Sequence, residues 1–391
     1  MISLGNLKKI VVCPDSFKGS LSAKDVADTI INNIRAIKNN IEIINLPLAD
    51  GGEGTSELLY QKVFPIKRST YAHDPLGRLI EVEYLGDMTG EKAFIESAAV
   101  IGLPLLNKEE RNPLLTSSFG LGELIKDAIN KGYKEITVAL GGSSTNDGGM
   151  GMLSVLGYIF EDKDGNLLSG EGKSLSKETK IKVSDIKDLI KQTKFTTICD
   201  VTNTLLGENG ATKIYAPQKG ATEDEIEILE NGMHNYVRAL KKAFPGRMEN
   251  LNQPGDGAAG GLGFALRTML DSKNIRGIDY ILDLLDFNSI IKDADLIITG
   301  EGKIDKQSLM GKVLSGVINR AKNFNIPVLA IGGSIEDRDI LDRENLITYR
   351  AISDPSKTLA ENMKKPIAIE NLGNTIRNFF LGNRVDAPYD A

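Results

Sequence analysis

Near its N-terminus the chain reads Ile10-Val11-Val12-Cys13-Pro14-Asp15-Ser16-Phe17-Lys18-Gly19-Ser20, a short apolar run followed directly by a glycine-containing loop with charged side chains. An apolar run of this length is typical of a buried strand. Ser22, with Asp25 three residues later, predicts that a helix follows, because this spacing matches a capping box. The stretch therefore predicts a βα unit of an α/β protein, with its polar loop at the carboxyl end of the strand, where such proteins bind ligands.

Five further loops that carry carboxylates, most of them rich in glycine, follow along the chain. They span residues 49–55, 141–149, 199–203, 255–261 and 299–305. Most come directly after apolar runs that predict strands, at residues 41–48, 136–140, 196–199 and 296–299. Glycine allows backbone N–H groups to surround anionic oxygens, and Asp or Glu can bind a hard cation such as Mg²⁺. Together the loops predict a binding site for a metal-bound polyphosphate.

The composition indicates a globular protein of about two domains. The chain has 391 residues, of which 41% are hydrophobic, and its formal net charge is −6. The negative charge argues against a sequence-independent nucleic-acid binder, because such a protein would show a basic stripe, and none occurs. No run of about 18 uncharged apolar residues occurs that would predict a membrane span. Cys13 and Cys199 are expected to be reduced packing thiols. We therefore expect a cytoplasmic protein that binds neither nucleic acid nor membrane.

The two ends of the chain predict one parallel sheet. Two strands near the N-terminus are each followed by a helix. Near the C-terminus, strands at 295–299, 327–331 and 345–351 alternate with helices at 308–322, near 335–342 and near 369–380. Joining them gives a flavodoxin-like, doubly wound sheet of five parallel strands in the order 2-1-3-4-5. Residues 1–75 and 280–391 are thus predicted to form one domain.

The middle of the chain, residues 76–279, predicts an inserted mixed α/β domain, with the active site in the cleft between the two domains. Residues 67–84 alternate polar and apolar around a turn at 74–78, which is typical of an antiparallel ribbon. Thr222 and Glu225 predict the start of a long helix. Two consecutive domains divided near residue 160 stay an alternative, because a polar turn at 162–166 can act as a linker.

The familiar nucleotide-binding motifs are missing. No Gly-Lys pair has the earlier glycine that a Walker-type phosphate loop requires. Gly255, Gly257 and Gly260 match the dinucleotide pattern, but they follow Gln253-Pro254 rather than a strand. Neither His-Arg-Asp nor Asp-Phe-Gly of protein kinases occurs. These observations disfavour a P-loop enzyme, a dinucleotide-dependent dehydrogenase and a protein kinase.

Longer strings resemble the bacterial glycerate kinase family of type 1. They occupy residues 11–22, 49–55, 140–152, 215–221, 255–263 and 300–305, and the resemblance runs in order from about residue 8 to about residue 380. One of them reads Tyr215-Ala216-Pro217-Gln218-Lys219-Gly220-Ala221. Ser144 and Thr204 depart from the family pattern, where Ala and Pro are expected, but neither departure removes a charged group.

The resemblance implies Mg²⁺- and ATP-dependent phosphorylation of D-glycerate, with attack by the 2-hydroxyl to give 2-phosphoglycerate. It also implies two α/β domains with the site between them. Attack at the 3-hydroxyl and a related acid such as tartronate or hydroxypyruvate stay open, as does a monomeric or dimeric state. A hydroxy-acid dehydrogenase and a non-catalytic regulator are remote alternatives, since the sequence lacks a dinucleotide fingerprint after a strand and a basic helix-turn-helix unit.

Phosphoryl transfer requires cations and N–H groups on the phosphates, carboxylates on the metal, a carboxylate near the attacking hydroxyl and a cation for the substrate carboxylate. The predicted catalytic residues are Lys18, Asp50, Asp200 and Asp305. The predicted metal ligands are Asp200, Asp256 and Glu301. The predicted nucleotide-binding residues are Gly141, Gly142, Ser143, Asn146, Asp147, Asp256, Gly257 and Lys303. The predicted substrate-binding residues are Ser16, Lys18 and Arg78.

Each of these side chains also has an ordinary structural interpretation. Asp50 can cap a helix at Thr55, Asp200 can stabilise a turn, and Lys18 and Arg78 can be solvated surface charges. The two histidines, His73 and His234, are expected to have no special role.

Overall fold

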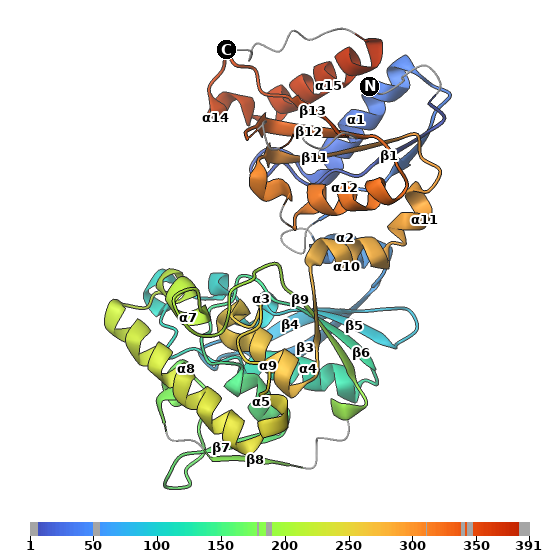
Figure 1. Ribbon diagram of the computed structural model, residues 1–391. Helices are drawn as coiled ribbons and strands as arrows, with labels where there is room; N and C mark the ends of the chain where they lie inside the picture. Colours follow the sequence, from blue (N-terminus) through green and yellow to red (C-terminus); the bar gives the residue numbers. More distant parts are fainter. Residues whose placement is uncertain are drawn as a thin grey trace. The chain divides into compact units, whose positions relative to one another are not determined.

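The computed structural model describes residues 7–49, 55–177, 180–184, 190–309, 311–337, 341 and 347–382. The chain divides into two compact units, which are described separately (Figure 1). Unit 1 consists of Met1–Leu58 and Gly277–Ala391, and unit 2 consists of Leu59–Arg276. Both units are α/β, as the sequence predicts.

Unit 1 contains a five-stranded sheet in which all neighbouring strands are parallel. Its order is β13-β12-β11-β1-β2, and the strands span Ile347–Ala351, Val328–Ile335, Leu296–Ile304, Lys9–Val12 and Glu42–Asn45. Ile10 lies opposite Leu296, so the two ends of the chain meet at the centre of the sheet. This topology confirms the predicted order 2-1-3-4-5.

Helices cover both faces of this sheet (Figure 1). Alternate residues of a strand point to opposite faces of the sheet. Ile10 and Val12 pack on one face with α1 (Ala23–Ile37) and α15 (Lys365–Leu381). Val11 points to the other face. That side is covered by α10 (Gly277–Leu284), α11 (Phe287–Ile291) and α12 (Val313–Asn323). Ser22 and Asp25 form the predicted capping box of α1. Half of the helix expected near 335–342 falls outside the described residues, and its first residue, Ile335, belongs to β12.

Strand β11 is longer than the sequence predicts, and this changes the placement of two site residues. The expected strand ends at Thr299, but pairing with β12 continues, with Glu301 opposite Gly332 and Lys303 opposite Ser334. Glycines tolerate this close backbone pairing without a side chain that would clash. Glu301 and Lys303 therefore lie two residues apart on one strand and point to the same face.

Unit 2 contains a six-stranded mixed sheet in the order β10-β9-β6-β5-β4-β3. Its strands, in that order, span Lys273–Ile275, Lys194–Ile198, Glu135–Ala139, Lys92–Glu96, Leu79–Gly86 and Ile66–His73. β3, β4 and β5 are antiparallel, which confirms the predicted ribbon, and the remaining pairs are parallel. A separate hairpin joins β7 (Tyr158–Glu161) and β8 (Lys180–Val183).

The helices of unit 2 enclose one large apolar core. Among the described residues, the helices that contribute to this core are α3 (Ala98–Ile101), α4 (Phe119–Asn130), α5 (Met150–Val155), α7 (Ala211–Tyr215), α8 (Glu223–Ala243) and α9 (Leu262–Met269). Helix α2 (Thr55–Lys62) begins in unit 1, where its Leu58 packs against an apolar cluster, and ends in unit 2. Thr222 and Glu225 form the capping box of α8 as predicted. Among the described residues, every helix is too short or too polar to cross a bilayer.

Candidate active site

A cavity of about 440 Å³ lies in unit 1, at the carboxyl ends of the sheet strands. Its lining includes four residues that the sequence assigns to the site, namely Ser16, Lys18, Glu301 and Lys303. They come from the loop after β1 and from the end of β11, which are neighbours in the sheet. The cavity therefore lies at the edge of the sheet where α/β proteins bind ligands.

Glu301 is the most unusual group of this cavity. Its residue is 7% exposed, and its Oε2 lies 3.5 Å from Nζ of Lys312 at the start of α12. Its Oε1 is buried and has no hydrogen-bond partner among the described residues. Burial raises the pKa of Glu301, although Ser308 and Lys312 partly offset this effect. A buried carboxylate oxygen without a partner is costly, so it indicates a place for a ligand's donor or a cation.

The cavity also carries basic groups. Nζ of Lys303 lies 2.9 Å from Glu336 and 3.6 Å from Asp305, and the hydrogen bond with Glu336 raises the pKa of Lys303. Lys18 is exposed at the rim. With Lys312 this gives three ammonium groups, which can attract an anionic ligand.

Asp305, at the end of β11, holds the following turn. Its Oδ1 accepts hydrogen bonds from the backbone N–H groups of Gln307 at 2.8 Å and Ser308 at 3.3 Å. Partial burial acts to raise the pKa of Asp305, but these bonds and the charge of Lys312 outweigh it, so the pKa is lowered. Asp305 is thus an ionised carboxylate close enough to Glu301 to interact with it electrostatically.

The loop after β1 is held tightly against β11. The backbone N–H of Asp15 donates to the carbonyl of Gly300 at 2.8 Å, and Oδ1 of Asp15 accepts from the N–H of Ser16 at 2.6 Å. A Cβ at Gly302 would lie 3.3 Å from the backbone nitrogen of Lys18, tighter than an ordinary contact. Glycine at position 302 therefore lets this loop reach the cavity.

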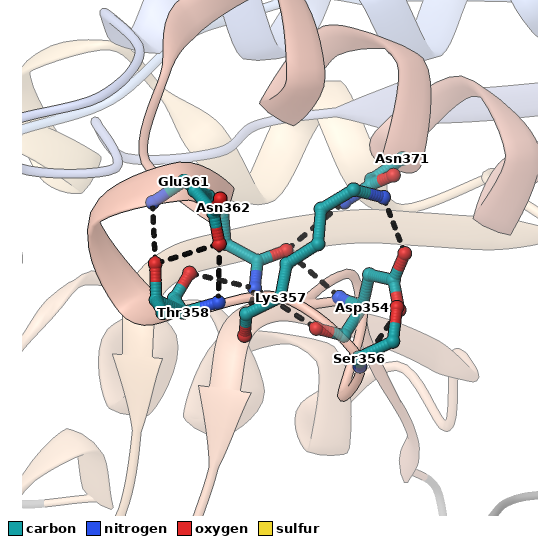
Figure 2. A network of polar contacts seen from close by, with 7 residues as sticks. All are labelled: Asp354, Ser356, Lys357, Thr358, Glu361, Asn362 and Asn371. Atoms are coloured by element: carbon teal, nitrogen blue, oxygen red, sulfur yellow. Dashed lines mark hydrogen bonds and ion pairs between the residues drawn. The ribbon is translucent and has the colours of Figure 1, made fainter.

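Another part of the cavity wall comes from the segment after β13, with Ile352, Ser353, Leu359, Asn362 and Met363 in the lining. Asn362, which is 9% exposed, braces this segment (Figure 2). The Asn362 side chain accepts from the N–H of Asp354 at 2.8 Å and donates to the carbonyls of Asp354 and Thr358 at 2.9 and 3.2 Å. Thr358 and Glu361 form a capping box on α14 (Leu359–Asn362). Lys357 pairs with Asp354 and lowers its pKa. The wall is therefore preformed.

In unit 2 the loop after β6 is built around Asp147, which is fully buried. Its carboxylate accepts from N and Oγ of Ser118 at 2.8 and 2.6 Å and from the N–H groups of Gly149 and Gly151 at 3.0 and 3.2 Å. Burial raises the pKa of Asp147 in spite of these bonds. Its oxygens thus hold the loop to the starts of α4 and α5.

The other residues assigned to this loop lie close by. Asn146 is buried and donates from Nδ2 to Oγ1 of Thr212 at 3.1 Å, while its Oδ1 has no partner among the described residues. Ser143 is also buried, whereas Gly141 and Gly142 are exposed at the loop's tip. The structure therefore leaves only the tip of this loop open to a ligand without rearrangement.

Asp256 and Arg78 are engaged in ion pairs within unit 2. The fully buried Asp256 receives two 2.7 Å hydrogen bonds from Arg267 and a third from the N–H of Gln253. Arg78 pairs with the buried Asp74 and, at 2.8 Å, with Glu110. Their predicted ligand-binding roles require that these pairs open, and they stay predictions.

Asp200 lies just after the carboxyl end of β9, and the backbone N–H of Gly257 donates to the carbonyl of Asn203 in the same loop at 2.9 Å. The loop of Asp50 lies outside the described residues. Asp200 is exposed and follows the buried thiol of Cys199, whose pKa burial raises to about 11. A Cβ at Gly257 would lie 2.3 Å from the carbonyl oxygen of Thr204, so glycine is required there. Burial likewise raises the pKa of Cys13, so both thiols are protonated at neutral pH.

Comparison with known proteins assigns the chain to a family. The model of the "Glycerate kinase family" matches residues 10–381. The chain belongs to the glycerate kinase family. It is 42% identical to Glycerate 2-kinase of Escherichia coli K12 over 84% of this chain and 86% of that protein, and 40% identical to Glycerate kinase of Bacillus subtilis 168 over 84% and 85%.

A solved structure supports the same family assignment. A crystal structure from Salmonella typhimurium LT2, provisionally assigned as glycerate kinase 2, is 36% identical with a TM-score of 0.80, covering 96% of this chain and 98% of that one. The resemblance seen in the sequence is thereby confirmed, and the chain is a kinase that transfers a phosphoryl group to an alcohol.

One buried residue of this kinase was given no role by sequence reasoning. Lys219, only 3% exposed, donates from Nζ to the carbonyl of Thr145 at 2.7 Å and to Oγ of Ser143 at 3.2 Å. Burial lowers its pKa to about 7, and the nearby charge of Asp147 opposes this shift. The available signal was its place in the family string at residues 215–221.

The residues of unit 1 fit a magnesium ion. Among the described residues, no three His, Cys, Asp or Glu side chains gather into a group that could hold a metal by themselves. Mg²⁺ in phosphoryl-transfer enzymes is usually bound by one or two carboxylates together with substrate phosphates and water. Glu301, with its unused oxygen, and the neighbouring Asp305 meet that requirement.

Proposed function

We propose that this kinase phosphorylates D-glycerate with Mg-ATP and produces 2-phosphoglycerate, and that it does so in the cytoplasm, where ATP is available. The observation that carries the proposal is the unit 1 cavity, where the buried carboxylate of Glu301 lies among basic groups and one of its oxygens has no hydrogen-bond partner within the described ranges. A relative that is 42% identical is named Glycerate 2-kinase, which supports the choice of the 2-hydroxyl.

In the proposed reaction the hydroxyl oxygen of glycerate attacks the γ-phosphorus of ATP. The new O–P bond forms, the bond between the γ-phosphorus and the bridging oxygen breaks, and ADP leaves. The ammonium groups of Lys18, Lys303 and Lys312 attract and orient the phosphates through charge-assisted hydrogen bonds.

Glu301 and Asp305 would hold Mg²⁺, which neutralises charge on the phosphates when bound. Asp200 and Asp50 stay the proposed carboxylates for the proton of the attacking hydroxyl, and Ser16 and Lys18 the proposed contacts for the acid. Gly141, Gly142 and Gly257 stay proposed backbone contacts for the nucleotide.

A coupled ADP-release assay with D-glycerate, tartronate and hydroxypyruvate tests this function. We expect rapid ADP release with D-glycerate and its abolition by EDTA, with recovery when excess Mg²⁺ is added. Phosphorus NMR of the product separates 2-phosphoglycerate from 3-phosphoglycerate. Turnover that persists in EDTA would contradict the metal assignment, and a faster rate with another acid would contradict the substrate.

A further inference from the structure

The lining of the unit 1 cavity has two chemically different parts. One part is charged and includes Glu301 on β11 and Lys312 at the start of α12. The other part is apolar and includes Ile352, Leu359 and Met363, all from the segment that follows β13. A ligand that fills such a cavity needs an apolar part and an anionic part.

One member of this apolar part is exposed, whereas Ile352 is buried. Leu359 is 70% exposed, and it is the first residue of α14, directly after the capping residue Thr358. Single exposed leucines are common and need no explanation. This one, however, borders a cavity and sits on the helix that Asn362 fixes in place (Figure 2), so the apolar surface is already formed and needs only a ligand to cover it.

The size of the cavity and the character of its lining distinguish between the two substrates of a glycerate kinase. A volume of about 440 Å³ is within the range of roughly 300–1,000 Å³ that is typical of binding sites for drug-sized ligands. D-glycerate is a three-carbon acid with a polar group on every carbon, so it has little apolar surface to place against Leu359 and Met363. Adenosine has a flat base with apolar faces, and its nucleotides end in anionic phosphates.

From this match we infer that the cavity of unit 1 is the nucleotide subsite, with the adenine against the wall of Ile352, Leu359 and Met363 and the phosphates toward Glu301 and Lys312. The inference rests on the proposed function, because it takes ATP as the phosphoryl donor. It adds a location for the base and assigns residues 352–363 the role of selecting the nucleoside.

Binding of a fluorescent N-methylanthraniloyl derivative of ATP, measured without turnover, tests the inference. Leu359→Asn removes the apolar side chain with little change in volume and no change in charge. Leu381→Asn is the matched control, because Leu381 is 57% exposed at the end of α15 and does not line the cavity. We expect Leu359→Asn to weaken nucleotide binding about tenfold and Leu381→Asn to bind like the unaltered protein.

Two competitors and one kinetic measurement complete the experiment. Adenosine alone should displace the fluorescent nucleotide from the unaltered protein. Leu359→Asn should lower the affinity for adenosine about as much as the affinity for ATP. It should change the affinity for inorganic tripolyphosphate less than threefold. The KM for D-glycerate should stay within twofold. Unchanged nucleotide binding in Leu359→Asn, or a rise confined to the KM for D-glycerate, would overturn the inference. If D-glycerate supports no ADP release but nucleotide binding still depends on Leu359, the proposed function fails and the subsite stands.

Discussion

Loops with the same sequence character have different tasks in the two units. At the end of β11 in unit 1, Glu301 lines a cavity and has one carboxylate oxygen without a hydrogen-bond partner in the part of the chain that the structure describes. In unit 2, Asp147 and Asp256 are fully buried, and their oxygens are bound by serine, glycine and arginine donors of the same unit. Glycine next to a carboxylate therefore predicts where a loop lies, but the surrounding donors decide whether the carboxylate supports the fold or remains available to a ligand.

The largest effect is expected where the carboxylate supports the fold. Asp147→Ala would leave the N–H groups of Ser118, Gly149 and Gly151 buried without their acceptor, and each such loss costs about 1–3 kcal/mol. We expect a loss of at least about 3 kcal/mol in the free energy of unfolding, measured by urea denaturation. Asp162→Ala, in an exposed turn, should lose much less stability than Asp147→Ala. Equal losses in the two variants would contradict the structural role of Asp147.

Asp200 differs from the other carboxylates of unit 2, because it is exposed just after the end of β9. If it accepts the proton of the attacking hydroxyl, Asp200→Asn should lower kcat by about 10²–10⁴-fold. The melting temperature should stay unchanged. Asp164→Asn, an exposed turn carboxylate in the same unit, serves as the control. A near-normal kcat for Asp200→Asn would remove this residue from the site.

Glu301→Gln tests the role of the unit 1 carboxylate. We expect kcat/KM to fall about 10²–10³-fold, since a group that stabilises developing charge is lost. Stability should not fall at neutral pH. The folded pKa of Glu301 is raised by burial, so ionised Glu301 costs stability increasingly as the pH rises above its unfolded pKa, and glutamine removes that cost.

Thermal melts and kinetics on one preparation check both parts of this prediction. Glu42→Gln, on the exposed strand β2, is the control and should change neither quantity. A Glu301→Gln variant that loses stability while keeping normal kcat/KM would place Glu301 with the structural carboxylates.

Sequence patterns predicted the parallel sheet of unit 1 well, because short apolar runs and capping boxes are local signals. They did not predict that β11 continues through Glu301 and Lys303, since this extension depends on pairing with Gly332 and Ser334 of β12. Nor could they separate Asp147 from Glu301, because the decisive donors on Asp147 include Ser118, which lies 29 residues away. The buried state of Lys219 was equally hidden, as lysine is normally exposed.

Lys219 gives the smallest expected effect and the most specific one, because its signature is a dependence on pH. The folded pKa is lowered from 10.5 to about 7. The unfolded chain therefore binds the proton more tightly, and the cost of burying the ammonium is fully present below pH 7. That cost is relieved as the pH rises from 7 toward 10.5, so the Lys219 contribution increases stability over this window by up to about 1.4 kcal/mol per pH unit.

Lys219→Met keeps the length and apolar stem of the side chain but cannot titrate, so the stability difference between the unaltered protein and the variant isolates this contribution. We expect the difference, measured by urea denaturation between pH 6.5 and 9, to shift in favour of the unaltered protein as the pH rises. Lys213→Met, in an exposed ion pair with Glu208, should show no such slope over this range. A flat difference for Lys219→Met would mean that Lys219 stays protonated throughout, held by Thr145, Ser143 and the charge of Asp147. The Lys219 ammonium would then stay charged at every physiological pH. It would continue to donate hydrogen bonds to Thr145 and Ser143 of the 141–149 loop.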